Sequence, residues 1–471
     1  MTEKPGARVE LTIEKMAPEG KGLARSGNRI IFIPHAAPGD RLQVALDRVK
    51  EGYALGRIVK VLEPGPGRIV PPCPLHYRPP GDEPRPAVVC GGCDWQHLSA
   101  ETQLAAKRDL ILDCLERIGK LRGVPVAATL ASPAAWRYRN KVQVPFAKVG
   151  DGVQAGFYSP GSHQIADFDD CPVQPELSVR VVRKVKELAA ALRWSVYDES
   201  SDRGWLRHLL VRTNADGKAL AAVVSKTEDF PGRERFLSAM VEAFPELASV
   251  FHNVQPLKTS VVLGPTWKLL RGHARMQERL GKLTLRFSPS AFLQVNTPAC
   301  EVLYKAVADF LGEDGFRPDL LLDLYCGVGS IALWLAPACR KVLGVEENRQ
   351  AVEDAWENAR LNNVKNARFV AGTAESMTAK LRREFDPFEP GTCAAVVDPP
   401  RAGCEETVLR AFSSPAVRRV VYVSCNPPTL ARDAGVLAAV GYVLKKVQPV
   451  DLFPQTSHIE AVALFERGRR P

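Results

Sequence analysis

The stretch that decides the fold of this chain is Asp323-Leu324-Tyr325-Cys326-Gly327-Val328-Gly329. It completes an apolar run that starts near residue 320 and has the composition of a buried parallel strand. Two glycines directly after such a strand allow a tight turn and let the backbone approach a ligand closely. The stretch therefore predicts the first strand and first turn of an open α/β sheet with a nucleotide-like ligand.

The sequence around this stretch alternates apolar strand patterns with helical patterns. From about residue 317 onward, strands are expected near 320–325, 341–346, 367–371, 394–398, 419–424, 442–448 and 459–466. This βαβ rhythm predicts a Rossmann-like sheet. The last two strands are separated only by a short turn around 453–456, which predicts a closing hairpin with one antiparallel strand.

The second strand of this sheet carries an acidic residue suited to a ribose. Glu346 follows Gly327 by 19 residues and can accept hydrogen bonds from both ribose hydroxyls. The third glycine of the dinucleotide fingerprint is missing, because Ile331-Ala332 stands where a pyrophosphate would approach. The pattern disfavours NAD and favours a nucleoside without a diphosphate, such as S-adenosylmethionine.

Two further strand ends carry candidate catalytic residues. Asp398-Pro399-Pro400-Arg401 and Ser424-Cys425-Asn426-Pro427 each follow a strongly apolar strand. Open α/β sheets place their chemistry at the carboxyl ends of the strands. A cysteine there can act as a nucleophile if it becomes a thiolate. Together the three strand ends predict covalent catalysis beside a nucleoside-type cofactor.

The N-terminal region reads as a small basic barrel. Between residues 8 and 62, short strands recur about every 10 residues with glycine turns, as in a barrel of the OB type. Its charges are mostly basic: Lys15, Lys21, Arg25, Arg29, Arg41, Arg48, Lys50, Arg57 and Lys60. The whole chain of 471 residues has a formal charge of +10, which favours a polyanionic partner such as RNA. An ordinary solvated barrel surface is the alternative.

The region between barrel and sheet is expected to be a central α+β domain. It contains a proline- and glycine-rich connection at 63–92, a helix at 99–119 with Ser99 as N-cap, and mixed strands and helices at 135–285. Basic and aromatic residues interleave at 136–139 and 205–208, a pattern suited to stacking on bases. Ordinary strand surface is the alternative for these two runs.

Four of the eleven cysteines look organised. Cys90-Gly91-Gly92-Cys93 forms a Cys-x-x-Cys turn, with Cys73 upstream and Cys171 downstream. Four thiolates suit either zinc or an iron–sulfur cluster, and the spacing does not choose between them. No export signal is recognised at the start of the chain, so a disulfide framework is not expected.

In this order the strand-end motifs resemble those of the RNA 5-methyluridine (uracil-C5) methyltransferases. Phe292-Leu293-Gln294-Val295-Asn296 is similar to that family's Phe-x-Gln-Val-Asn element, and His458-Ile459-Glu460 to its catalytic-base element. The barrel resembles its TRAM domain, and the barrel with the cysteine cluster resembles the ribosomal RNA branch. The resemblance covers nearly the whole chain. It implies a TRAM domain at 1–62, a central domain at 63–285 and a class I methyltransferase domain at 286–471.

The resemblance also implies a role for each candidate residue. Cys425 is the expected nucleophile and Glu460 the expected base. The residues expected at S-adenosylmethionine are Gln294, Tyr325, Gly327, Glu346 and Asp398. The expected ligands of a [4Fe–4S] cluster are Cys73, Cys90, Cys93 and Cys171. Sixteen residues separate Cys73 from Cys90, more than the family pattern has.

These roles fit the chemistry of uracil, whose C5 is a poor nucleophile. A thiolate that adds to C6 turns C5 into an enolate carbon able to attack a methyl group. A base must then remove the C5 proton so that the thiolate can leave. Ribosomal RNA is the expected substrate and transfer RNA the second candidate. The enzyme is expected to be a cytoplasmic monomer without a membrane span, since no apolar run reaches about 18 residues.

Other classes of function, two enzymatic and one non-enzymatic, stay open on the sequence alone. Asp-Pro-Pro also resembles the motif of amino-group methyltransferases, which need no cysteine nucleophile. RNA 5-methylcytosine enzymes do use cysteine, but some place one directly after Asp-x-Pro, where this chain has Arg401. A non-catalytic RNA-binding protein with a vestigial fold is the third possibility.

Overall fold

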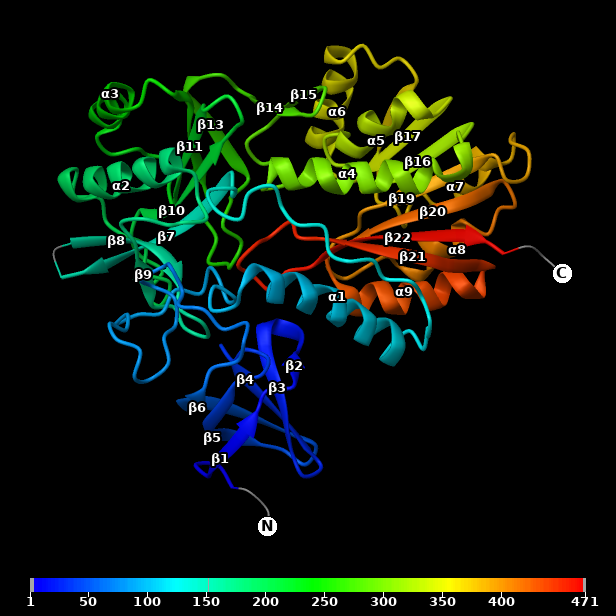
Figure 1. The fold of residues 1–471 in the computed structure, drawn as a ribbon. Coiled ribbons are helices and arrows are strands. Elements are labelled where there is room, and N and C mark those ends of the chain that lie inside the picture. The colour runs from blue at the N-terminus through cyan, green and yellow to red at the C-terminus, as the bar shows by residue number, and fades with distance from the viewer. Residues whose placement is uncertain (1–3, 151, 469–471) are drawn as a thin grey trace.

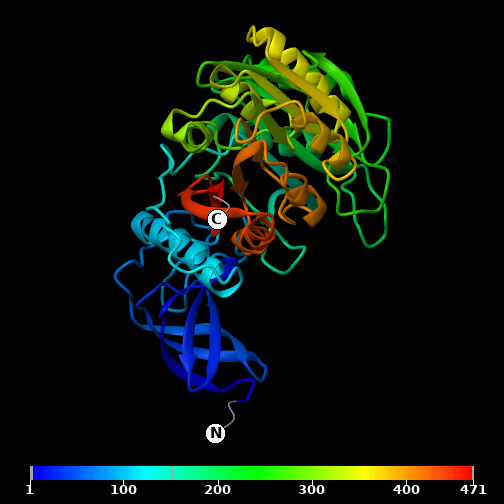
Figure 2. The same cartoon turned by 90° about the vertical axis from the view of Figure 1, so that its right-hand side faces the viewer.

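The computed structural model describes residues 4–150 and 152–468. Figure 1 shows three bodies along the chain: a barrel in blue, a central sheet in teal and green, and a C-terminal sheet in yellow to red. The barrel projects from the other two, and Figure 2 shows the same arrangement from the side. Among the described residues no helix is long and apolar enough to cross a membrane.

The N-terminal body is a closed barrel, as expected. Its sheet has the order β1-β5-β6-β4-β3-β2. β1 pairs with β5 at one edge, and β2 follows β1 after two residues and pairs with β3 at the other edge, so one stretch of chain closes the barrel. The strands are β1 (Arg8–Thr12), β2 (Lys15–Met16), β3 (Lys21–Ser26), β4 (Arg29–Pro34), β5 (Arg41–Val49) and β6 (Tyr53–Glu63). A short 3-10 turn, η1 (Pro18–Gly20), links β2 to β3.

The central body is a seven-stranded mixed sheet, which confirms the α+β expectation. Its order is β13-β12-β11-β10-β7-β8-β9, and only β11 and β12 run parallel. One face packs on α2 (Glu176–Ala191) and α3 (Arg233–Ala243), and the other packs toward α4 (Thr297–Leu311). The strands are β7 (Lys141–Val149), β8 (Gly152–Tyr158), β9 (Ile165–Asp167), β10 (Leu206–Thr213), β11 (Ala219–Ser225), β12 (Leu247–Val254) and β13 (Thr266–Gly272). A hairpin of β14 (Met276–Leu280) and β15 (Leu283–Phe287) follows.

The C-terminal body is the predicted Rossmann-like sheet. Its order is β18-β17-β16-β19-β20-β22-β21, with every neighbour pair parallel except those that involve β22. The antiparallel strand is therefore the last one in the chain, inserted between β20 and β21. The strands are β16 (Leu320–Leu324), β17 (Lys341–Glu346), β18 (Ala367–Ala371), β19 (Cys393–Val397), β20 (Val417–Ser424), β21 (Tyr442–Val450) and β22 (Glu460–Arg467).

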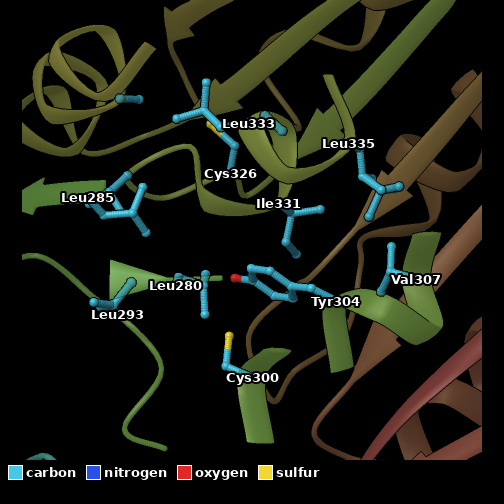
Figure 3. Packing of buried hydrophobic residues seen from close by; sticks show 14 of the residues in the cluster. Leu280, Leu285, Leu293, Cys300, Tyr304, Val307, Cys326, Ile331, Leu333 and Leu335 are labelled. Atoms are coloured by element: carbon cyan, nitrogen blue, oxygen red, sulfur yellow. The ribbon is translucent and has the colours of Figure 1, made fainter. Parts of the chain in front are cut away.

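Helices cover both faces of this sheet. One face packs on α4, α5 (Ser330–Leu335) and α6 (Arg349–Leu361). Figure 3 shows this layer, where Tyr304 and Val307 of α4 face Ile331 and Leu335 of α5. The other face packs on α7 (Thr378–Phe385), α8 (Glu406–Ala411) and α9 (Pro427–Ala439). Both faces are buried, which explains why the strands read as continuous apolar runs.

The helix expected at 99–119 forms as α1 (Ala100–Arg117), and Ser99 caps it by accepting a hydrogen bond from the N–H of Thr102 at 3.2 Å. α1 precedes the central sheet in sequence but packs beside α9 (Figure 1). The chain after α1 continues along the same sheet edge, where Ala127 N–H bonds to the carbonyl of Val447 at 3.0 Å. α1 also meets the barrel through an ion pair between Lys15 and Asp113. α1 thus joins the barrel to the C-terminal body.

The run Trp205-Leu206-Arg207-His208 does not form a base-stacking surface, and that expectation is wrong. Trp205 is buried against Trp194 and Phe230, with ring centroids 4.6 Å and 5.0 Å away. The guanidinium of Arg207 is also buried and donates to the carbonyls of Gln255, Leu257 and Thr259. A buried cation is tolerated here because three carbonyl oxygens satisfy it.

A second buried cation lies on the apolar face of α1. The ammonium of Lys107 is fully buried and lies 2.5 Å from the carboxylate of Asp451, which is 7% exposed. It also donates to the carbonyl of Phe453 at 3.1 Å. Two desolvated charges are stable only when each satisfies the other. The pair therefore fixes the loop after β21 against α1.

We predict that Lys107→Met destabilises the fold by about 3–5 kcal/mol, because it leaves the Asp451 carboxylate buried and unpaired. The double variant Lys107→Met/Asp451→Leu should recover most of this loss, since no charge remains. The midpoint of urea unfolding, followed by tryptophan fluorescence, measures both. Arg410→Met is the control: it breaks the exposed pair with Glu406 and should change the free energy of unfolding by less than about 1 kcal/mol. Equal losses in the single and double variants would contradict the role of the pair.

Candidate active site

The turn after β16 has the backbone that the glycines predict. Gly327 and Gly329 have φ values of +54° and +80°, and Tyr325 is left-handed as well at +63°. A Cβ on Gly329 would lie 2.9 Å from the ring of Phe369, so only glycine fits there. A Cβ on Gly327 would meet nothing within 4 Å. The backbone at Gly327 therefore faces open space.

The predicted acid of the second strand meets this turn. The carboxylate of Glu346 accepts a hydrogen bond from Gly327 N–H at 3.1 Å and another from Asn348 N–H at 2.9 Å. Tyr325 donates through its hydroxyl to Glu375 at 3.1 Å. The structure thus brings together the strand-end residues that the sequence assigns to the cofactor.

Two acids under the turn have unusual surroundings. Asp323 is fully buried, and within the described chain its carboxylate oxygens have no well-formed hydrogen bond; only the backbone of Ala332 favours its ionised form. Burial and the neighbouring Asp398 raise the pKa of Asp323 well above its ordinary value. Burial raises the pKa of Asp398 to about 7. Among the described residues no cation lowers the pKa of either carboxyl group, so the pair is suited to a positively charged ligand.

Gln294 lies in the loop between β15 and α4 and is buried. Its backbone carbonyl accepts a hydrogen bond from the side chain of Asn140 at 3.3 Å. Within the described residues no hydrogen bond joins its side chain to Tyr325, Glu346 or Asp398. The loop is anchored two residues later by Asn296, which caps α4 and donates to the carbonyl of Leu452 at 2.9 Å.

The two candidate catalytic residues lie at the ends of neighbouring strands, since Cys425 directly follows β20 and Glu460 begins β22. β20 and β22 are antiparallel, and the last pair in their ladder is Ser424 with Ala461. One step further in the same register sets Cys425 against Glu460. Residues opposite each other in an antiparallel pair have Cβ atoms about 4.5–5.5 Å apart. The strand order thus joins residues that the sequence alone could not pair.

Cys425 borders a cavity of about 420 Å³ that is open to solvent. Its lining includes Arg401, His458 and Ile459 from the sheet side, and Pro18 and Glu19 from the barrel. Cys425 is half-buried, whereas Glu460 is 4% exposed. One barrel turn, η1, therefore stands at the rim of the cavity that holds the nucleophile candidate.

Charged groups around Cys425 shift the pKa of its thiol in opposite directions. Burial, Glu460 and Asp398 raise the pKa of the Cys425 thiol to about 11, and Arg401 acts in the opposite sense. Burial and Asp398 raise the pKa of Glu460 well above its ordinary value, while Arg401 and Lys107 lower it. Arg401 is thus the nearby charge that favours both ionised forms.

Arg401 is held in position from two sides. Its guanidinium donates to Nδ1 of His458 at 2.9 Å. Burial and Arg401 lower the pKa of His458 to about 4, so the ring is neutral and can accept this bond at pH 7. The side-chain amide of Asn426, next to Cys425, donates to the carbonyl of Arg401 at 2.8 Å.

The loop that carries His458 toward Glu460 is held by residues from distant parts of the chain. Gln103 of α1 exchanges two hydrogen bonds with Gln455, at 2.9 Å and 3.0 Å. Asp94 accepts from Ser457 N–H at 2.8 Å, and Tyr138 donates to the carbonyl of Pro454 at 2.9 Å. Gln103, Lys107 and Asp94 belong to none of the sequence motifs described above. Gln103 and Lys107 are four residues apart on the apolar face of α1, a spacing that could have marked them as buried.

The four organised cysteines line one cavity of about 230 Å³. Cys90 N–H bonds to the carbonyl of Leu75 at 2.8 Å, so the long insert leaves and returns at one point, and Cys73 stays beside the others. Arg137 holds the segment that contains Cys171. Its guanidinium binds both carboxylate oxygens of Asp170 and the carbonyl of Cys171.

The separation of these thiols bears on which metal they suit. Among the described residues, no three of the four sulfurs lie within 4.8 Å of one another. A single tetrahedral zinc would hold sulfurs about 3.8 Å apart, given Zn–S bonds of about 2.3 Å. Burial raises the pKa of Cys90 to about 12 and that of Cys171 to about 11. The open arrangement around a central cavity fits a cluster of metal ions better than one ion.

The cysteine cavity and the Cys425 cavity share a wall, because His458 lines both. Asp94, which directly follows Cys93, also holds the loop before His458. A change at the cysteines would therefore reach the catalytic candidates through one or two residues.

Comparison with known proteins identifies related sequences along the whole chain. The family described as tRNA (Uracil-5-)-methyltransferase matches residues 269–468, and the TRAM domain matches residues 3–59. An RNA methyltransferase of Halalkalibacterium halodurans is 40% identical over 461 residues, 97% of this chain and 96% of that protein. One of Bacillus cereus is 37% identical over 462 residues, 98% of this chain and 96% of that protein.

A solved structure is similar over nearly the full length. It is the Pyrococcus abyssi tRNA (uracil-54, C5)-methyltransferase in complex with S-adenosyl-L-homocysteine, with a TM-score of 0.73 and 26% identity. The match covers 97% of this chain and 99% of that one. The likeness includes the barrel and the central body as well as the Rossmann-like sheet.

We predict that alkylation of Cys425 by iodoacetamide accelerates about tenfold per pH unit between pH 7 and 9.5, because the thiolate fraction rises steadily below a pKa of about 11. Arg401→Gln should slow it several-fold at pH 9, since removing the cation raises the thiol pKa further. Mass spectrometry of the Cys425 peptide measures the rate, with the exposed Arg410→Gln as control. A rate that levels off below pH 8 in the wild type would show a preformed thiolate and contradict this account.

Proposed function

The chain belongs to the RNA (uracil-5-)-methyltransferase family, and on that basis we propose that it methylates C5 of a specific uridine in RNA through a covalent bond between Cys425 and C6 of the base. The family makes the protein an S-adenosylmethionine-dependent RNA methyltransferase. The observation that supports the proposed mechanism is the register of β20 and β22, which ends at Ser424 with Ala461 and, continued by one residue, would bring Cys425 opposite Glu460.

The residues around Gly327 fit S-adenosylmethionine, which when bound supplies a methyl group on a sulfonium. Glu346 can accept hydrogen bonds from the ribose hydroxyls, and Gly327 leaves room for the nucleoside. Asp323 and Asp398 form an acidic floor without a cationic partner in the protein. The cofactor's ammonium and sulfonium charges suit such a floor. Tyr325 and Gln294 complete the proposed set.

The two catalytic roles follow from the positions of Cys425 and Glu460. Addition of the Cys425 sulfur to C6 places electron density on C5, which then takes the methyl group. C5 at that point carries both a methyl group and a hydrogen. The Glu460 carboxylate removes that hydrogen as a proton, the C5–C6 double bond re-forms, and Cys425 leaves as a thiolate.

The pKa shifts support Glu460 as the base and Cys425 as the nucleophile. A carboxylate whose pKa is raised by burial is a stronger base than an exposed one, which suits Glu460. Arg401 favours the thiolate of Cys425, and a cation bound at Asp398 would act in the same direction because it offsets that carboxylate. We therefore propose that Cys425 becomes reactive only when the cofactor site is filled.

Ribosomal RNA is the substrate class we propose first, on the resemblance of the barrel and cysteine set to that branch. Transfer RNA is the second candidate, favoured by the name of the similar Pyrococcus abyssi enzyme. The barrel turn at the rim of the Cys425 cavity supports a role of the barrel in RNA binding. Acidic partners neutralise several of its basic residues: Lys15, Lys21, Arg25, Arg41 and Arg57. Shape at this rim would then contribute to recognition along with charge.

We also propose that the domains span residues 1–62, 63–285 and 286–471, and that the protein acts as a monomer in the cytoplasm. One chain carries every residue of the proposed catalytic site, which supports action as a monomer.

We further propose that Cys73, Cys90, Cys93 and Cys171 hold a [4Fe–4S] cluster. The cavity between the four thiols and the wide spacing of their sulfurs support this assignment over a single zinc. Such a cluster would tie together three segments of chain. The segment of Cys90 and Cys93 continues into Asp94, which holds the loop that leads to Glu460. The segment of Cys171 is bonded to Arg137, whose neighbour Tyr138 holds the same loop. The role of the cluster would be to position the base.

We predict that protein purified without oxygen carries about four irons per chain, as a [4Fe–4S] cluster requires. Cys73→Ser should lose most of the iron, because its sulfur borders the same cavity as the other three. Cys339→Ser, a buried cysteine outside that cavity, is the control and should keep its iron. Iron and acid-labile sulfide analysis measures this. Zinc bound at the cysteines, with no iron, in protein purified without oxygen would contradict the proposal.

We predict that Glu460→Gln traps the enzyme on its substrate, whereas Cys425→Ala forms no adduct. Without the base, methyl transfer can still occur but elimination cannot, so the RNA stays bound through Cys425. The trapped species should appear as a slow band on a denaturing gel. Cys425→Ala should lower methylation by at least a thousandfold. RNA containing 5-fluorouridine should trap the wild-type enzyme in the same way, because fluorine cannot leave C5 as a cation.

Running this assay with ribosomal and transfer RNA separately identifies the substrate class. Cys404→Ala, which alters a buried cysteine beside Tyr325, controls for nonspecific thiol effects. Full activity of Cys425→Ala would favour the amino-group class of methyltransferase. Wild-type turnover by Glu460→Gln would remove Glu460 from the mechanism.

A further inference from the structure

Three histidines meet where the barrel joins the central region. His35 follows β4 of the barrel, and His76 and His97 lie on either side of the Cys90–Cys93 turn. Each ring offers a nitrogen, and these nitrogens lie within 4.8 Å of one another. In the part of the chain that the structure describes, no other group of three histidine, cysteine or acidic side chains is this close.

Each ring has one buried nitrogen without a hydrogen-bond partner. These are Nδ1 of His35, Nε2 of His76 and Nδ1 of His97. Buried polar atoms are nearly always satisfied, and leaving one unsatisfied costs about 1–3 kcal/mol. Three rings this close together, each with such an atom, suit a shared ligand.

The opposite nitrogens of two rings are fixed by backbone carbonyls. His76 Nδ1 donates to the carbonyl of Tyr77 at 3.0 Å, and His97 Nε2 donates to that of Ala36 at 3.3 Å. A proton on these nitrogens leaves the lone pair on the other nitrogen of each ring, which is the one without a partner. Metal-binding histidines typically donate their second ring nitrogen to a carbonyl or carboxylate in this way.

The charges around the trio suit neutral imidazoles. Burial lowers the pKa of His35 to about 3 and also lowers the pKa values of His76 and His97. Arg68 faces all three rings, but its guanidinium lies 2.6 Å from the buried carboxylate of Asp40, which offsets its charge. Arg78 and Asp94 face His76 with opposite charges.

We propose that His35, His76 and His97 bind one Zn²⁺ ion that ties the barrel to the central region. Three imidazoles and one open position form a common zinc site. Zinc would draw the three nitrogens to about 3.3 Å from one another, given Zn–N bonds of about 2.0–2.1 Å. His35 keeps some exposure and stacks on Tyr77 with centroids 4.3 Å apart, so it lies on the side from which an ion can enter.

The consequence for the protein is a fixed barrel orientation. His35 belongs to the barrel, whose turn η1 stands at the rim of the Cys425 cavity. His76 and His97 belong to the loops that carry the cysteines. An ion shared by these three residues would hold the barrel turn over the catalytic cavity independently of any RNA.

The test must separate this site from the cysteines, because His76 also borders the thiol cavity. Protein made anaerobically in zinc-supplemented medium is analysed for zinc content and by X-ray absorption at the zinc edge. We expect about one zinc per chain, with nitrogen or oxygen neighbours at about 2.0–2.1 Å and no sulfur at about 2.3 Å.

His35→Phe keeps the aromatic stack on Tyr77 but removes the ligand, and should lower zinc affinity at least tenfold. His163→Phe alters an exposed histidine of the central region and should leave zinc unchanged. Circular dichroism and S-adenosylmethionine binding report on folding, with His76→Phe as the second variant. Sulfur neighbours at the zinc edge, zinc retained in a folded His35→Phe, or no zinc in the wild type would each overturn the proposal. The wild-type spectrum decides alone if both variants fail to fold.

Discussion

The ion pair between Lys107 and Asp451 is the constraint on which the proposed active site depends. It is buried, so it persists only in a narrow geometry, and it joins a helix from the first third of the chain to the loop before β22. Gln103, Asp94 and Tyr138 hold the same loop by hydrogen bonds. That loop determines where β22 begins, and β22 begins with Glu460. The position of Glu460, the proposed base, is therefore set by residues far from it in sequence.

The buried acids near the proposed cofactor site lower the stability of the fold, although their proposed roles require them to be buried. Asp323, Asp398 and Glu460 all have pKa values raised mainly by burial. A carboxyl group whose pKa is raised on folding destabilises the fold as pH rises above its unfolded value, because ionisation is then less favourable in the folded protein. These groups therefore reduce stability at neutral pH. Binding of a cationic cofactor would relieve part of that penalty, which links cofactor binding to the stability of this body.

Much of the architecture could be predicted from the sequence because it depends on local patterns. Buried parallel strands read as apolar runs, and the contact of Gly327 with Glu346 follows from adjacent strands. The proximity of Cys425 to Glu460 could not be derived, because it requires knowing that β22 inserts beside β20. The run at 205–208 was wrongly predicted to bind RNA, because backbone carbonyl groups can satisfy a buried arginine as well as phosphates can. The trio of His35, His76 and His97 has no sequence spacing that would reveal it.

The most direct test of the proposed mechanism is tritium release from RNA labelled at C5 of uridine. If Glu460 removes the C5 proton after Cys425 has added to C6, the wild-type enzyme should release one tritium for each methyl group transferred. Glu460→Gln should transfer methyl groups to bound RNA and release almost no tritium. Release by Glu460→Gln at the wild-type rate, or methylation by the wild type without tritium release, would contradict the account.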